Sequence, residues 1–215
     1  MIFNIQIDFY IGDIVIVAIE GVDGTGKSTL ASELGSRNNM CVVRCSAPDY
    51  LTEVRQAMRK ELDKYVQQHF TYYLCVLAML LRENADDIAK RGAVFDRYLY
   101  STRVTHIAFD RHYNKGANID QIVRLSEEAE KSVPKPDLVI FLRLDEKTRR
   151  ERIALRASNN SIDTHSDLIG LFEREFEIEI LRLRRLNIPI RIIDSSPPLK
   201  EIVSKVESMI GIIRA

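Results

Sequence analysis

A glycine-rich run near the start of the chain has the residue types and spacing of a phosphate-binding loop. It reads Gly21-Val22-Asp23-Gly24-Thr25-Gly26-Lys27-Ser28 and matches the pattern G-x-x-x-x-G-K-[ST]. Glycines let the backbone curl so that successive N–H groups point at phosphate oxygens, and the start of a following helix adds its positive partial charge. We therefore expect a nucleotide to bind here, through Gly21, Asp23, Gly24, Thr25, Gly26, Lys27, Ser28 and Thr29.

Two side chains of this loop suggest how the nucleotide is held. Lys27 should bridge the β- and γ-phosphates of ATP, and the Ser28 hydroxyl should be a ligand of Mg²⁺. ATP and Mg²⁺ are thus the expected cofactors. The loop does not fix the reaction, because motors, GTPases and kinases all share it.

A second chemical cluster follows a short apolar run, Ala93-Val94-Phe95, which ends in Asp96 and Arg97. The carboxyl ends of parallel strands meet at the edge of an open sheet where ligands bind. There Asp96 can hold a Mg²⁺-bound water or accept a proton from the attacking oxygen, and Arg97 can clamp a second anion. A surface salt bridge at a strand end is the alternative interpretation.

The rest of the chain has the pattern of a scaffold that can position these groups. Short β-branched runs alternate with longer segments of helical periodicity, which predicts parallel strands covered by helices on both faces. One helical stripe, from Phe70 to Leu81, should pack against the sheet. The expected strands are Ile14–Ile19, Cys41–Cys45, Ala93–Asp96, Leu138–Leu144 and Ile190–Ile193.

Length and composition fit a single α/β domain. The chain has 215 residues, and Lys plus Arg equals Asp plus Glu at 31 each, so no overall field attracts nucleic acid or a membrane surface. We expect neither as a partner, and no apolar run is long enough to cross a bilayer. Residues 14–215 should form the domain, and residues 1–13 an additional strand or arm.

Cysteines and charges give two smaller expectations. Cys41, Cys45 and Cys75 show no spacing of a disulfide framework or metal site, which predicts buried, reduced thiols and fits the cytoplasm. The charged run at 173–185 has the pattern of the solvent-exposed face of a long helix.

The two chemical clusters together resemble the thymidylate kinase family. The stretch from Glu20 to Thr29 resembles its phosphate-binding loop, and Asp96-Arg97-Tyr98 resembles its Asp-Arg-Tyr signature. Residues 136–142 and 193–199 resemble its strand before the lid and its last strand, so the resemblance covers nearly the whole chain from about residue 14.

The resemblance implies a P-loop NTPase fold, an α/β domain with a five-stranded parallel sheet flanked by helices, and a short lid. It also implies an enzyme of nucleotide biosynthesis that moves a phosphoryl group from ATP to a nucleoside monophosphate, dTMP foremost, and that forms a homodimer. Asp23 would lie near the sugar hydroxyl of the acceptor, and Arg97 on its phosphate.

A basic cluster marks the lid, near residues 149–164. Phosphoryl transfer needs cations around the migrating group, and the loop itself carries no arginine. Arg152 and Arg156 share a helix face and match the lid pattern of the family. A solvated basic helix face is the alternative, and for Arg149 and Arg150 it is the favoured one. The expected catalytic residues are Lys27, Asp96, Arg97, Arg152 and Arg156, and the expected metal ligands are Ser28 and Asp96.

We expect the acceptor to lie between the loop and the helix after residue 66. Its expected contacts are Asp23, Arg44, Phe70, Tyr73 and Arg97. The aromatic residues can stack on a base or belong to the core. Arg103 and His106, on the helix after the second cluster, can face the acceptor or pack.

Several positions favour other activities. Cys75 stands where the family has a base-contacting arginine, and Val104-Thr105-His106 stands where it has Ala-Tyr-Gln. The run from Phe95 to Arg103 also resembles the Glu-Arg-Ser-x-Tyr-Ser-x-Arg segment of deoxynucleoside kinases. Phosphorylation of a nucleoside is therefore an alternative, and a regulatory P-loop protein that transfers nothing is a second one.

Overall fold

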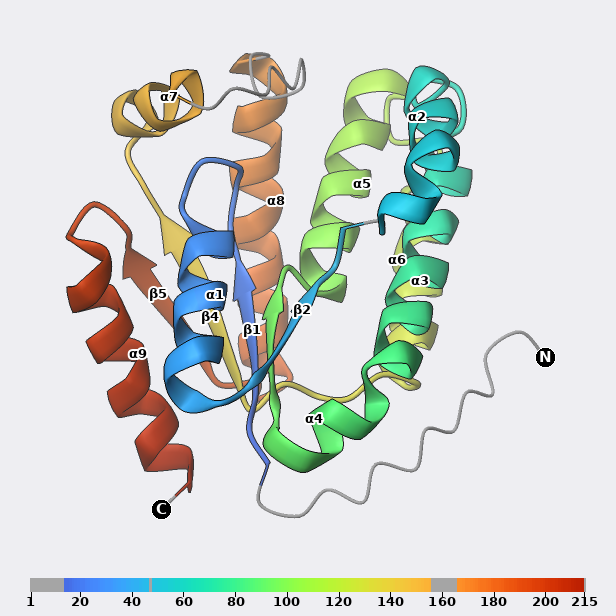
Figure 1. Ribbon diagram of the computed structural model, residues 1–215. Coiled ribbons are helices and arrows are strands. Elements are labelled where there is room, and N and C mark those ends of the chain that lie inside the picture. The colour runs from blue at the N-terminus through green and yellow to red at the C-terminus, as the bar shows by residue number, and fades with distance from the viewer. Residues whose placement is uncertain (1–13, 47, 156–165, 215) are drawn as a thin grey trace.

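The computed structural model describes residues 14–46, 48–155 and 166–214 (Figure 1). Arg156, the expected arm at 1–13 and most of the expected lid lie outside these ranges. The sheet has five strands in the order β2-β3-β1-β4-β5, and every neighbouring pair is parallel. Its strands are β1 (Ile16–Glu20), β2 (Cys41–Arg44), β3 (Ala93–Asp96), β4 (Leu138–Arg143) and β5 (Ile190–Asp194).

The sheet confirms the expected fold class. All five expected strands are present, with ends shifted by at most two residues, and β1, which precedes the glycine-rich loop, is central. The helical segments are α1 (Lys27–Asn38), the 3₁₀ turn η1 (Asp49–Leu51), α2 (Thr52–Lys60), α3 (Val66–Glu83), α4 (Ala85–Arg91), α5 (Leu99–Tyr113), α6 (Ile119–Glu130), α7 (Glu146–Ala154), α8 (Ser166–Arg185) and α9 (Leu199–Arg214).

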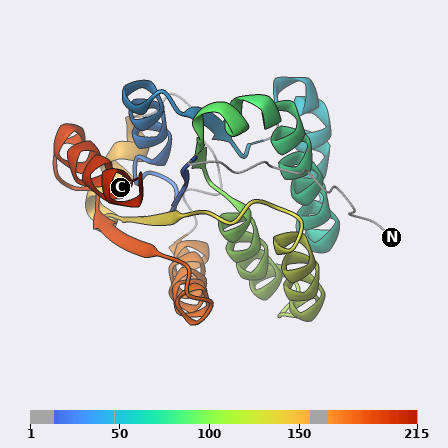
Figure 2. The ribbon, with the colours of Figure 1, turned by 90° about the horizontal axis from the view of Figure 1, so that it is seen from below.

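Helices cover both faces of the sheet, as Figure 2 shows from below. On one face Val17 and Ile19 pack with residues of α1 and α9, and on the other Ile16 and Ala18 pack with residues of α3, α5, α6 and α8. A strand with apolar partners on both sides is apolar throughout, which explains why β1 reads as a continuous hydrophobic run. The carboxyl ends of the strands face the top of Figure 1, where α2 and α7 lie above them.

The expectation for the charged run at 173–185 is wrong in part, because two of its carboxylates are buried. Glu175 and Glu179 of α8 are only 4% and 3% exposed. Glu175 accepts a hydrogen bond from Arg111 Nε at 2.7 Å, and Glu179 lies 3.5 Å from Arg103 Nε. Both arginines come from α5, which packs against α8. These cations, together with Arg182, offset the cost of burying the carboxylates.

Whether each thiol is buried depends on the face of the strand or helix that carries it. Cys41 and Cys45 are buried, as expected, but Cys75 is exposed, and all three are free. On α3 the core side carries Phe70 and Leu74, and one residue further along a helix is about 100° around its axis. Cys75 therefore points away from the core. Among the described residues no helix combines the length and the apolar character needed to cross a membrane.

Candidate active site

The glycine-rich loop joins β1 to α1 at the carboxyl edge of the sheet (Figure 1). Gly21 has a φ of 134°, and a Cβ there would lie 2.5 Å from the carbonyl oxygen of Leu142 in β4. At Gly24, with a φ of 91°, a Cβ would lie 2.8 Å from Arg149 Cγ. Both positions thus require glycine for space as well as for backbone conformation. The loop is held tightly between β4 and α7.

Lys27 begins α1 and is only 5% exposed. Its ammonium donates a hydrogen bond to the Val22 carbonyl at 2.7 Å and lies 3.6 Å from Asp23 Oδ1. Burial and the charge of Arg97 lower the pKa of Lys27 to about 8, although nearby carboxylates oppose the shift. Lys27 is therefore still mainly charged at neutral pH. Ser28, the next residue, is exposed in the first turn of α1.

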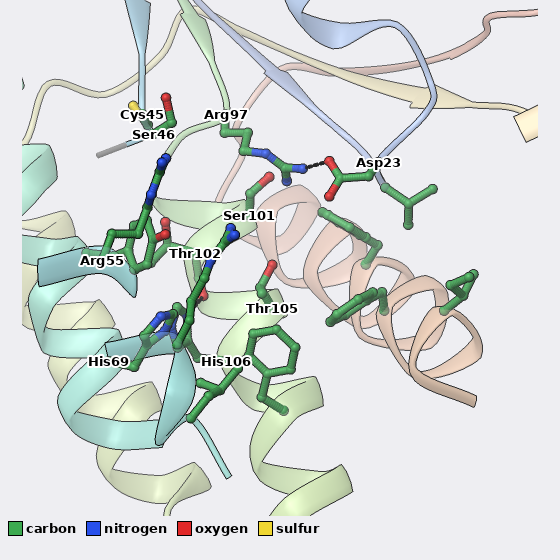
Figure 3. Close-up of a pocket in the computed structure, with 18 of the residues that line it drawn as sticks. Asp23, Cys45, Ser46, Arg55, His69, Arg97, Ser101, Thr102, Thr105 and His106 are labelled. Carbon is green, nitrogen blue, oxygen red and sulfur yellow. Dashed lines mark hydrogen bonds and ion pairs between the residues drawn. The ribbon is translucent and has the colours of Figure 1, made fainter. Parts of the chain in front are cut away.

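Arg97 reaches from the end of β3 to the loop. Its φ of 70° is in the left-handed region, which is unusual for a residue other than glycine. Its N–H donates to the Ile19 carbonyl at 3.0 Å, and its guanidinium donates to the Asp23 carboxylate (Figure 3). Burial disfavours the charge, yet the carboxylates of Asp23, Glu20 and Asp96 raise the Arg97 pKa above its ordinary value. Two anchors thus hold a strained residue beside the loop.

Asp96, which ends β3, is 7% exposed. It lies close enough to Lys27 for its charge to raise the Lys27 pKa. The structure therefore brings together Asp23, Lys27, Asp96 and Arg97, which were predicted from two segments far apart in the sequence.

Glu20 is a site residue to which the sequence analysis gave no role. It ends β1, is 0% exposed, and accepts hydrogen bonds from the N–H groups of Tyr98 at 3.1 Å and Ser101 at 3.2 Å. The Ser101 hydroxyl also donates to it. Glu20 thus caps the start of α5 from another element. Burial raises the pKa of Glu20 to about 7, against the opposing effects of Ser101, Arg97 and Lys27. Its position directly before the loop was the available signal.

The arginines of α7 flank the loop. Arg149 is 1% exposed, donates from Nη1 to the Asp23 carbonyl at 3.1 Å, and forms a bidentate pair with Glu146. Hydrogen bonds from Arg149, and then from Arg150, lower the pKa of Glu146 to about 2. Because Arg149 is buried, the solvated face favoured for it is wrong. That interpretation holds for Arg150, which is exposed.

Arg152 lies close to Gly26 of the loop. Its Nη2 donates to the Ser195 carbonyl at 2.9 Å, and its Nη1 is 3.9 Å from where a Cβ on Gly26 would lie. Arg156, the expected companion of Arg152, lies outside the described residues.

A cavity of about 320 Å³ adjoins the loop and extends between α2, α3, α5 and α8 (Figure 3). Among the described residues that line it, four arginines face a single carboxylate, that of Asp23. The arginines are Arg55, Arg59, Arg97 and Arg149. Arg97 is paired with Asp23 and Arg149 with Glu146. The excess positive charge therefore comes from Arg55 and Arg59, and it suits an anionic ligand.

The remaining wall of the cavity is largely apolar. It includes Leu62, Tyr73, Phe109, Ile169, Phe172 and Phe176. Such a surface suits the flat face of an aromatic ring. The cavity therefore offers a cationic surface for an anion and an apolar surface for a ring.

Of the predicted acceptor contacts, Asp23, Tyr73 and Arg97 line this cavity, whereas Phe70 and Arg44 do not. Phe70 is 0% exposed and packs edge-on against His106 at 5.3 Å. Arg44 is exposed, donates to Ser32 Oγ at 3.0 Å, and lines a separate groove. Their contacts with an acceptor stay predictions.

Comparison with known proteins gives a consistent result. The thymidylate kinase family model matches residues 19–206. The probable thymidylate kinase of Archaeoglobus fulgidus is 26% identical over 205 residues, which cover 91% of this chain and 94% of that protein. The thymidylate kinase of Leptospira borgpetersenii is 26% identical over 153 residues, 67% of this chain and 71% of that protein.

Solved structures share the fold. Deoxyadenosine kinase from M. mycoides with bound dATP has a TM-score of 0.73 at 18% identity, covering 92% of this chain and 100% of that chain. Thymidylate kinase from Candida albicans has a TM-score of 0.68 at 21% identity, covering 94% of each chain. These likenesses confirm the P-loop kinase fold.

Proposed function

Because this chain belongs to the thymidylate kinase family, we propose that it transfers the γ-phosphoryl group of ATP to dTMP and releases dTDP and ADP. The observation that carries this proposal is the cavity beside the phosphate-binding loop. Four arginines there face one carboxylate, and an apolar wall adjoins them. A nucleoside monophosphate has the matching parts, an anionic phosphate and an aromatic base.

The glycine-rich loop is the proposed site for the phosphates of ATP. Its backbone N–H groups and the start of α1 supply donors and positive partial charge. Lys27 would leave the Val22 carbonyl for a β- or γ-phosphate oxygen, which is a stronger partner for an ammonium than a neutral carbonyl.

The residues near Lys27 fit a Mg²⁺ ion. Ser28 and Asp96 offer oxygen atoms, which Mg²⁺ prefers. Among the described residues no cluster of three or more His, Cys, Asp or Glu side chains forms a metal cage. That agrees with Mg²⁺ held by one or two protein oxygens together with the phosphates of a nucleotide. When bound, the ion would neutralise charge on the transferring phosphoryl group.

In the proposed reaction, a phosphate oxygen of dTMP attacks the γ-phosphorus while the bond to the bridging oxygen of ADP breaks. Arg97 would hold the acceptor phosphate, and Asp23 its sugar hydroxyl. Arg149 and Arg152, which flank the loop, can stabilise the charge that spreads over the migrating group. A phosphate monoester is largely a dianion at neutral pH, with a second pKa of about 6, so its attack needs no general base. The metal-linked role of Asp96 is therefore favoured over a role as base.

The nucleoside kinase alternative has less support. Part of its support was the resemblance of the run from Phe95 to Arg103, but Arg103 is 6% exposed and contacts Glu179 and Ser126 between helices. A neutral nucleoside would also bring no phosphate to the arginines of the cavity. The non-catalytic alternative is opposed by Lys27 and Arg97, which lie together beside the loop.

The proposal is tested by ADP release with ATP and Mg²⁺ over a panel of nucleoside monophosphates and nucleosides. We expect the highest kcat/KM for dTMP. Turnover of nucleosides without turnover of monophosphates would overturn the proposal, and so would ATP binding with no turnover of any acceptor. The homodimer implied by the resemblance and the cytoplasmic location implied by the cysteine pattern accompany this proposal, and sedimentation velocity tests the oligomeric state.

A further inference from the structure

Two histidines form a hydrogen-bonded pair on the wall of the cavity. Nδ1 of His69, from α3, lies 2.7 Å from Nε2 of His106, from α5. Nδ1 of His106 lies 2.6 Å from the carbonyl oxygen of Thr102. Both side chains line the cavity, and they are 4% and 2% exposed.

This arrangement fixes the tautomer of each ring. The Thr102 carbonyl can only accept, so Nδ1 of His106 carries a proton and donates it. In a neutral ring the other nitrogen is then an acceptor, so Nε2 of His106 accepts from Nδ1–H of His69. Burial lowers the pKa of His69 to about 4, aided by the charge of Arg59, and that of His106 to about 3, so both rings are neutral at pH 7.

In this histidine pair, Nε2 of His69 is a hydrogen-bond acceptor that has no donor in the part of the chain that the structure describes. With its proton on Nδ1, His69 presents a lone pair at Nε2, and that atom is buried without a hydrogen-bond partner among the described residues. A buried polar atom left unpaired destabilises the folded protein. A ligand that brings an N–H to this atom would remove that destabilisation.

The position of the pair within the cavity indicates which part of a nucleotide would meet it. In Figure 3, His69 and His106 lie together on one side of the pocket, away from the Arg97–Asp23 pair, with Ser101 and Thr105 between. The Tyr73 ring is 5.0 Å from His69. With its phosphate on Arg97, a nucleotide would therefore extend its base towards the histidines.

We propose that His69 Nε2 accepts a hydrogen bond from the imino N3–H of the acceptor base, and that His106 is the positioning residue that fixes the tautomer of His69. This inference rests on the proposed function, since it presumes a pyrimidine monophosphate in the cavity. The imino group of thymine lies between two carbonyls. Arg55 and Arg59, which only donate, line the same cavity and suit those carbonyls.

Nε2 of His69 is buried, and Arg59 lies close enough to His69 for its charge to lower the His69 pKa. We infer that a bound base displaces the side chain of Arg59 to reach Nε2. The structure describes every residue of α2, and none of them is buried. Arg59 itself is exposed. Its rearrangement therefore sacrifices little packing.

The test compares dTMP with N3-methyl-dTMP, which lacks the imino proton, as acceptors for the parent protein, His69→Phe and His69→Gln. His112→Phe is the matched control, because His112 is an exposed histidine of α5. For His69→Phe we expect kcat/KM for dTMP to fall about 10- to 100-fold, mainly through KM. The preference for dTMP over its methylated analogue should shrink about as much. His69→Gln keeps an acceptor oxygen and should recover part of the kcat/KM for dTMP and part of the preference for dTMP over N3-methyl-dTMP. His112→Phe should match the parent.

The tautomer itself is tested by ¹⁵N NMR of the histidine rings. Nε2 of His69 should resonate as an unprotonated nitrogen in the parent and acquire protonated character in His106→Phe, which frees Nδ1 from its acceptor. Circular dichroism and the KM for ATP should stay at parent values in every variant, because the loop is intact.

The outcomes separate this inference from the proposed function. If the parent phosphorylates dTMP and His69→Phe keeps the full preference over N3-methyl-dTMP, the preference is steric, and the inference is wrong while the function stands. A protonated Nε2 in the parent would also overturn it. If the parent turns over no pyrimidine monophosphate, the proposed function fails first, and this inference fails with it.

Discussion

Replacing Glu20 with glutamine removes a carboxyl group that is 0% exposed at the junction of β1 and the phosphate-binding loop. Glutamine keeps an oxygen that can accept from the N–H groups of Tyr98 and Ser101, and its NH₂ can donate to the Ser101 hydroxyl. The variant therefore mimics the protonated acid and preserves the cap of α5. What it loses is the ability to ionise, so a comparison with the parent isolates the effect of that ionisation.

The magnitude follows from the raised pKa. The pKa of Glu20 moves from its ordinary 4.5 to about 7 in the folded protein, chiefly because burial disfavours the charge. The folded state holds the proton more tightly, so this group contributes stability that is complete below pH 4.5 and is lost as the pH rises through about 7. Between about pH 5 and about pH 8 the parent should lose about 2.5 kcal/mol relative to Glu20→Gln.

Urea denaturation of both proteins at the two pH values measures this difference. His69 and His106 act in the opposite direction, because their lowered pKa values give stability that is lost as the pH falls below 6.5. Their contribution is common to both proteins and cancels in the difference. Glu128→Gln, at an exposed carboxyl on α6, is the control. Between the two pH values its free energy of unfolding should change by the same amount as that of the parent, to within about 0.5 kcal/mol. A difference between parent and Glu20→Gln that is the same at both pH values would refute the reasoning.

Three further substitutions test the site. Lys27→Ala should lower kcat on the order of 100-fold or more in an ADP-release assay, and a variant as fast as the parent would show that the proposed ATP site is wrong. Arg97→Ala should reduce kcat/KM about 100-fold for a monophosphate and far less for a nucleoside, because only the monophosphate offers an anion; equal losses would remove its proposed role. Gly21→Ala should abolish ATP binding in calorimetry and destabilise the protein by about 2 kcal/mol, since its Cβ would lie 2.5 Å from the Leu142 carbonyl oxygen. Gly211→Ala, where a Cβ would meet no atom within 4 Å, should be neutral or stabilising by up to about 1 kcal/mol, and a loss as large as that of Gly21→Ala would contradict the steric argument.

The sheet could be predicted because its signals are local. A strand covered on both faces reads as an unbroken apolar run, and residues 16–19 and 138–142 are such runs. The loop follows β1 directly, Asp96 ends β3 and Arg97 follows it, so parallel packing alone brings the two clusters to one edge. Their proximity follows from topology and requires no knowledge of side-chain contacts.

Side chains whose environment depends on distant partners could not be predicted in this way. Glu175 and Glu179 look like surface residues in the sequence, but α5 supplies the arginines that permit their burial. Arg149 likewise reads as part of a solvated basic face, yet it packs against Gly24 and bonds to the Asp23 carbonyl, 126 positions away. Helical periodicity shows which residues share a face, but it does not show which element covers that face.

The part of the cavity proposed to bind phosphate could be predicted from the sequence, but the part proposed to bind the base could not. This difference bears on the choice of substrate. Contiguous motifs build the phosphate part, so the class of reaction can be inferred from sequence. The part that would meet the base comes from α2, α3 and α5. The unpaired acceptor at His69 Nε2 depends on a hydrogen bond between His69 and His106, which are 37 residues apart. The identity of the base therefore depends on tertiary contacts, and a change at either histidine can alter base preference while every recognisable motif of the chain stays intact.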